Sequence, residues 1–65
     1  MKIIVNGKPH EVSATTLADL MVELDYTSPF VATALNAEFV TREARADMWL
    51  TNGDQVEILA PMKGG

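Results

Sequence analysis

The sequence contains no cysteine and a single histidine, so it offers neither a disulfide nor a metal site built from these residues. It also lacks a long apolar run, and its apolar stretches fall far short of the roughly 20 residues that span a bilayer. No basic segment followed by an apolar stretch marks a leader. Five basic residues are scattered among nine acidic ones, a balance that argues against recognition of a phosphate backbone. We therefore expect a cytoplasmic protein with no membrane or nucleic-acid partner.

The sequence does contain enough apolar material for a small core. Hydrophobic residues make up 48% of the 65 positions, a content at which disorder is not expected. Such a chain forms one domain near the lower size limit, and its core rests on apolar packing alone. The net charge of −4 suits a partner with a basic docking surface.

The first dozen residues predict a hairpin. Residues 3–5 form a β-branched run, and Asn6-Gly7 follows as the dipeptide best suited to a tight type I′ turn. Residues 8–12 would return as a strand, and Pro9 would place that strand at the edge of a sheet because proline cannot donate a ladder hydrogen bond. His10 is expected on this exposed edge.

A single amphipathic helix is predicted next. Ser13, Thr15 and Thr16 are candidate N-cap residues. One apolar stripe follows at the spacing of a helix face, formed by Leu17, Leu20, Met21 and Leu24. The pattern stops before the Ser-Pro breaker at 28–29. The stripe is interpreted as the part of the core that covers a sheet.

The second half of the chain predicts three further strands. Residues 30–35 alternate, with Ala32 and Ala34 on one face, and either face of this strand can be the buried one. Residues 38–40 form a short strand, and residues 41–50 form a connection or a single helical turn in which Trp49 is a packing anchor.

The last predicted strand covers residues 55–60. The charge of Glu57 requires that its face lies outward, so Val56, Ile58 and Ala60 face the core. This alternation leaves Leu59 on the outer face.

These elements predict an α+β roll, with a mixed sheet of four to five strands and one main helix packed on one face. Residues 1–60 would form the domain and residues 61–65 a flexible tail. The bare face of the sheet is a candidate partner interface, with four apolar residues on it: Ile4, Ala32, Ala34 and Leu59.

The tail ends in Gly64-Gly65 after a lead of Met62 and Lys63. Glycine has no Cβ and tolerates most backbone angles, so such an end can thread a narrow channel and leave its carboxylate open to attack. An unselected, frayed terminus is the alternative interpretation.

Three segments carry a family resemblance: residues 1–7, residues 35–40, and residues 52–59 running into Gly64-Gly65. Together they resemble the sulfur carriers of thiamine biosynthesis, a family of ubiquitin-like β-grasp proteins, and the resemblance spans essentially the whole chain. The sequence departs from the family pattern at Thr41, where members often have proline, and around Trp49.

The resemblance implies a carrier with no catalytic residue, metal or cofactor of its own, monomeric when free. An adenylating (E1-like) enzyme, holding ATP and a metal, would activate the carboxylate of Gly65. A sulfur donor would then convert it to a thiocarboxylate, a C-terminal 1-thioglycine, which delivers sulfur to thiazole synthase for the thiazole ring of thiamine.

Three alternatives remain at this point. The chain is similar in the same features to the small subunit of molybdopterin synthase, which also ends in Gly-Gly. A ubiquitin-like protein modifier would join the same activated carboxyl to a lysine, and a plain interaction module would have a passive tail. The short, cysteine-free chain and its Asn-Gly opening favour the thiamine carrier.

Overall fold

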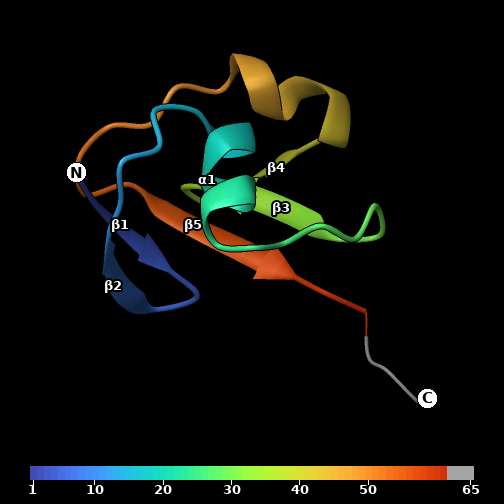
Figure 1. The fold of residues 1–65 in the computed structure, drawn as a ribbon, viewed down its shortest axis with the longest axis horizontal. Coiled ribbons are helices and arrows are strands. Elements are labelled where there is room, and N and C mark those ends of the chain that lie inside the picture. The colour runs from blue at the N-terminus through green and yellow to red at the C-terminus, as the bar shows by residue number, and fades with distance from the viewer. Residues whose placement is uncertain (62–65) are drawn as a thin grey trace.

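The computed structural model describes residues 1–61, which form a five-stranded mixed sheet with one main helix on one face (Figure 1). The strands are β1 (Lys2–Val5), β2 (Lys8–Glu11), β3 (Ala32–Leu35), β4 (Glu38–Val40) and β5 (Gln55–Leu59). The helices are α1 (Leu17–Glu23) and the 3₁₀ helix η1 (Arg42–Asp47), which joins β4 to β5. The predicted α+β roll is confirmed.

The strand order is β2-β1-β5-β3-β4, so the last strand of the sequence is the central strand of the sheet. β1 pairs with β2 and β3 pairs with β4 as antiparallel hairpins, whereas β5 runs parallel to β1 and antiparallel to β3. The first hairpin turns at Asn6 and Gly7, which both adopt left-handed backbone angles, with φ of 50° and 82°. Pro9 lies in the edge strand β2, as predicted.

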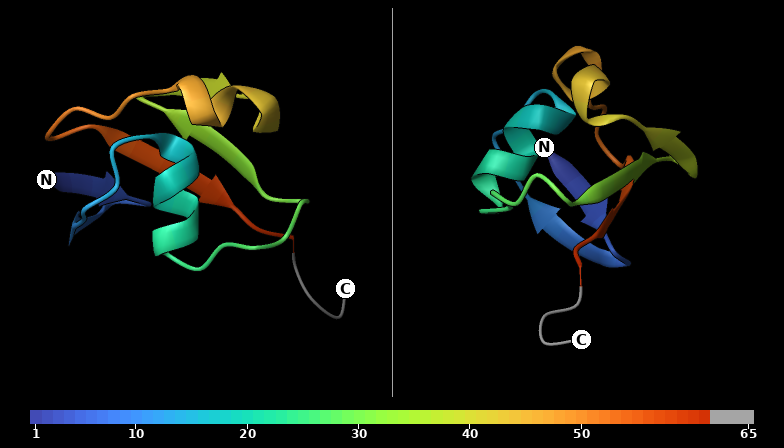
Figure 2. Two further views of the ribbon diagram at one scale, coloured as in Figure 1. Left: turned by 45° about the horizontal axis from the view of Figure 1, so that its top comes forward. Right: turned by 90° about the vertical axis from the view of Figure 1, so that its right-hand side faces the viewer.

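Helix α1 begins where its capping residue predicts. The Thr16 hydroxyl accepts a hydrogen bond from the backbone N–H of Asp19 at 3.1 Å, which satisfies one of the free donors in the first turn. The helix lies across one face of the sheet (Figure 2) and buries Leu17, Leu20 and Met21 against it.

The core lies between α1 and this inner face of the sheet. Alternation along β3 buries Thr33 and Leu35 and turns Ala32 and Ala34 outward, which settles the face of this strand. Each strand that carries a buried residue thus presents its neighbours to the opposite, outer face. The buried apolar residues form one cluster: Ile3, Val5, Val12, Ala14, Leu17, Leu20, Met21, Val31, Leu35, Val40, Leu50, Val56 and Ile58.

Arg45 of η1 is buried in the same region, with 7% of its surface exposed. Its Nε donates a hydrogen bond to the Thr33 hydroxyl at 2.9 Å, and its Nη2 donates to the carbonyl oxygen of Val31. The Thr33 hydroxyl in turn donates to the carbonyl oxygen of Val40 at 2.9 Å. Within residues 1–61 no carboxylate forms an ion pair with Arg45. Neutral oxygens therefore bind this guanidinium and fasten η1 to β3.

Three side chains depart from their predicted positions. Trp49 is 69% exposed, because the buried Leu50 turns its neighbour outward, so the prediction of a packing anchor is wrong. His10 pairs with Ile3 in the sheet register and is partly buried on the inner face, not on the exposed side of the edge. Ala60 follows the end of β5 and is exposed, so it does not face the core.

Candidate partner-binding site

The predicted reacting end of the chain, Gly65 with its lead of Met62, Lys63 and Gly64, lies outside the described residues. The structure describes the strand from which that end departs. β5 is held on both edges, by β1 and β3, so the chain reaches residue 60 from the middle of the sheet. The candidate site is therefore built from β5 and its neighbours.

β5 has two different faces. Val56 and Ile58 are buried under α1, with 1% and 4% of their surfaces exposed. Gln55, Glu57 and Leu59 point to the outer face, and Leu59 is 73% exposed. The predicted outward position of Leu59 agrees with this geometry.

The register brings three of the predicted interface residues together around the end of β5. Ala32 lies opposite Leu59, and Ala34 lies opposite Glu57 on one side and Phe39 on the other. Ala32, Ala34, Phe39 and Leu59 are called the outer patch below. With Thr33 and Glu57 they line a shallow hollow of about 90 Å³. The small alanine side chains leave space between the two large exposed ones.

Ile4 lies on the same outer face but outside the outer patch. It pairs with Gln55 at the start of β5, whereas Leu59 is four residues further along, a separation of about 13 Å in a strand. The predicted interface set therefore divides into a close group of three and a distant Ile4.

Phe39 is not among the residues that the sequence predicts for the interface, although it is 72% exposed and completes the outer patch. The alternation along the short strand at residues 38–40 indicates an outward Phe39, because a buried Val40 turns Phe39 to the other face. The pairing of Phe39 with Ala34 is a matter of register, which this strand of three residues does not specify.

A carboxylate borders the outer patch. Glu57 lies between Gln55 and Leu59 on the exposed face of β5 and belongs to the lining of the hollow. An apolar surface with an acidic border suits a partner that offers an apolar side chain flanked by a basic group.

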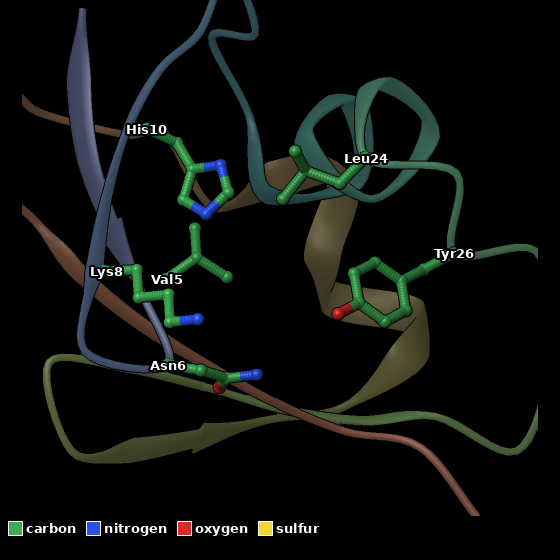
Figure 3. Close-up of a pocket in the computed structure, with 6 residues that line it drawn as sticks. All are labelled: Val5, Asn6, Lys8, His10, Leu24 and Tyr26. Carbon is green, nitrogen blue, oxygen red and sulfur yellow. The ribbon is translucent and has the colours of Figure 1, made fainter.

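A larger hollow of about 300 Å³ lies on the inner side, between the first hairpin and the end of α1 (Figure 3). His10 and Tyr26 face it from opposite sides, and Lys8 and Asn6 line its lower part in this view. Among residues 1–61 no carboxylate lines it, and no group of three His, Cys, Asp or Glu side chains is placed to hold a metal ion. Over the same range, none of the helices combines the length and apolar character needed to cross a bilayer.

Sequence comparison places the whole fold and the terminal glycines in one family. The ThiS family model matches residues 3–65. The chain belongs to the ThiS family. This confirms the resemblance to the sulfur carriers of thiamine biosynthesis. The sulfur carrier protein ThiS of Thermus thermophilus is 34% identical over 61 residues, which cover 94% of this chain and 95% of the relative.

Structural comparison agrees with ThiS membership. The crystal structure of the thiamine biosynthesis protein ThiS from Geobacter metallireducens superposes with a TM-score of 0.83 at 35% identity, with 100% of both chains covered. The chain is also 36% identical over 66 residues to the thiazole synthase of Paramagnetospirillum magneticum. It covers 20% of the length of that relative, and the same share of the thiazole synthase of Magnetococcus marinus.

Proposed function

We propose that this chain is a sulfur carrier of thiamine biosynthesis and that the carboxylate of Gly65 carries the sulfur. The observation that supports this most strongly is the match to the ThiS family from residue 3 to residue 65, which includes the terminal glycines. The chain acts as a co-substrate in the cytoplasm, and the chemistry is performed by its partners. It needs no metal or cofactor of its own.

The proposed reaction begins with activation of a poor electrophile. An oxygen of the Gly65 carboxylate attacks the α-phosphorus of ATP on an adenylating partner; an O–P bond forms, and the bond to pyrophosphate breaks. Hydrosulfide, or a donor equivalent to it, then attacks the acyl carbon. A C–S bond forms, AMP leaves with the electron pair of the broken C–O bond, and loss of the S–H proton to solvent yields the thiocarboxylate. The partner supplies the ATP, the metal and the alignment of the reacting atoms.

The glycines suit this reaction because Gly64 and Gly65 place no side chain around the acyl carbon. Residues 61–65 act as the tail that enters the partner, and residues 1–60 act as the folded domain that the partner holds. The outer patch is the docking surface, because it is apolar, exposed and placed at the end of the strand that leads to the tail.

Thiazole synthase is the proposed acceptor of the sulfur. Two relatives named thiazole synthase contain a segment that matches all of this chain within a fifth of their length. The presence of a carrier-like segment within a thiazole synthase supports a reaction between the carrier and thiazole synthase where the two are separate chains.

The test uses the 65-residue chain, an adenylating enzyme of the thiazole pathway, ATP and a hydrosulfide donor. Intact mass spectrometry should record the replacement of one oxygen by one sulfur, and an unchanged mass would refute the proposal. Deletion of Gly65 should abolish the exchange and leave the far-ultraviolet circular dichroism unchanged. Loss of the fold in that variant would assign the tail a structural role instead.

A cellular experiment distinguishes thiamine biosynthesis from molybdopterin synthesis, the nearest alternative pathway. A strain without this protein should require thiazole for growth and keep its molybdenum-cofactor enzymes active. The reverse result would assign the chain to molybdopterin synthesis.

A further inference from the structure

Asn6 stands where β1 ends, and its side chain continues the contact that β1 makes with β5. Its backbone N–H donates to the carbonyl oxygen of Val56 at 2.9 Å. Its side-chain Oδ1 accepts from the N–H of Ile58 at 2.8 Å, and its Nδ2 donates to the carbonyl oxygen of Ile58 at 3.1 Å. The backbone N–H and the carbonyl oxygen of Ile58 are thus both hydrogen-bonded to the side chain of Asn6.

The Asn6 amide replaces a missing stretch of strand. The parallel pairing of β1 with β5 stops at Val5 and Val56, because the chain turns away at Asn6 with a φ of 50°. A carboxamide has the same donor and acceptor as a peptide group. It therefore satisfies Ile58, which would otherwise present an unpaired N–H and carbonyl near the end of the central strand.

Asn36 binds the backbone of β5 at the opposite end of the strand. It also has a left-handed backbone, with a φ of 49°, and its Oδ1 accepts from the N–H of Gln55 at 2.9 Å. Its backbone N–H donates to the carbonyl oxygen of Gln55 at 2.7 Å. The two hairpin turns of the sheet thus each place an asparagine against β5, one at its first residue and one next to its last.

Only one of these two asparagines acts near the start of the tail. Ile58 is followed by Leu59 of the outer patch and then by the residues that lead to Gly65, whereas Gln55 lies at the far end of the strand. Figure 3 shows Asn6 lying against the course of β5. A fixed exit from the sheet limits the directions in which the tail can start, and this raises the fraction of docked complexes with the carboxylate in place.

We propose that Asn6 is a positioning residue for the reaction at Gly65, an inference that rests on the proposed sulfur-carrier function. Its amide holds Ile58, and thereby fixes the point and direction at which the chain leaves the sheet. Asn36 holds the other end of β5 with its Oδ1 and its backbone N–H, and has no such role.

The two asparagines supply a matched pair of variants, Asn6→Gly and Asn36→Gly. Glycine accepts the left-handed backbone at both positions, so each variant removes side-chain hydrogen bonds to β5 without adding backbone strain. The assay is ATP–pyrophosphate exchange by the adenylating enzyme, with the carrier concentration varied. Asn6→Gly should lower kcat by about tenfold, within the cost of misplacing reacting groups. Its KM should change little, because the outer patch is unaltered.

The control variant Asn36→Gly should keep the kcat of the wild-type chain. Amide hydrogen exchange should report the local effects, faster at Ile58 in Asn6→Gly and faster at Gln55 in Asn36→Gly. Equal kcat values for the two glycine variants would overturn the inference, as would an effect of Asn6→Gly on KM alone. A wild-type chain that supports no pyrophosphate exchange would overturn the proposed function itself.

Asn6→Asp gives a second measurement that does not depend on the glycine variant. The aspartate keeps the acceptor for the Ile58 N–H and loses the donor to the Ile58 carbonyl. It should also lower kcat. A wild-type kcat in this variant would contradict the proposed role of Asn6.

Discussion

Arg45 is the residue whose environment is least ordinary for its type. A buried guanidinium is usually paired with a carboxylate, because taking a charge out of water is costly. Here its described partners are the Thr33 hydroxyl and the Val31 carbonyl. Arginine suits this place because its charge is permanent and its donors form a rigid fork that reaches two oxygens at once.

Arg45→Ala should lower the free energy of unfolding by about 2–4 kcal/mol, since it leaves a cavity and two buried oxygens short of a donor. Urea denaturation of the purified chain measures this. Arg42→Ala is the control from the same 3₁₀ helix: Arg42 is exposed and 3.8 Å from Glu43, so its loss should cost less than about 0.5 kcal/mol. Equal losses in the two variants would contradict a stabilising role of the Arg45 hydrogen bonds.

Glu11 is a residue with a predictable pH dependence. The N-terminal ammonium donates a hydrogen bond to its carboxylate at 2.8 Å and holds the pKa of Glu11 below the ordinary value of a glutamate. Because the pKa is lower in the folded state than in the unfolded state, the ion pair stabilises the fold fully above the unfolded-state pKa. This stabilisation is lost as the pH falls through the folded-state pKa.

The difference in unfolding free energy between the wild-type chain and Glu11→Gln should therefore exist at neutral pH and vanish in acid below the folded pKa. It should also shrink in high salt, because this carboxylate is exposed. An NMR titration that found no lowering of the Glu11 pKa from the ordinary value of a glutamate would contradict the ion pair.

At the scale of elements, one face of β5 contributes to the stability of the fold and the other face contributes to the proposed binding of a partner. Its inward residues pack under α1, and its outward residues belong to the proposed docking surface. Substitutions on the two faces should therefore affect different measurements.

Leu59→Asp should change the free energy of unfolding by less than about 0.5 kcal/mol, as expected for an exposed site. It should weaken binding to the adenylating enzyme by at least about tenfold, because it puts a charge on the outer patch. Ile58→Ala is the control from the inner face and should cost about 2–4 kcal/mol of stability. Calorimetric titration and urea denaturation measure the two effects, and a larger stability loss for Leu59→Asp than for Ile58→Ala would reverse the assignment of faces.

The elements that the sequence predicted are those set by neighbouring residues. The turn at Asn6-Gly7 and the cap at Thr16 depend on chemistry within a few positions, and the helix stripe depends on a spacing along one segment. Arg45 depends on partners 12 and 14 positions away, and Phe39 depends on the register of a short strand. The reacting role of the tail came from the family resemblance, since two glycines do not specify a reaction.

At the scale of the whole molecule, the net charge of −4 is spread over a small surface. A charge of this sign raises the rate of encounter with a basic partner, and salt screens it. The association rate with the adenylating enzyme should fall by about tenfold between about 0.02 M and 0.5 M salt, while the dissociation rate changes little. Stopped-flow measurement of both rates tests this, and an association rate that is independent of salt would show that the charge plays no part in docking.

The central place of β5 also fixes when this molecule can assemble during its synthesis. The hairpins β1–β2 and β3–β4 are made first, yet they are not neighbours in the sheet until β5 enters between them. Until residues 55–59 have left the ribosome, the nascent chain contains two hairpins that are not joined into one sheet. Helix α1 then has no complete sheet face on which to pack. The domain folds only after the segment that leads to the terminal glycines has emerged, so a shortened product that lacks this segment has no folded surface for a partner to recognise.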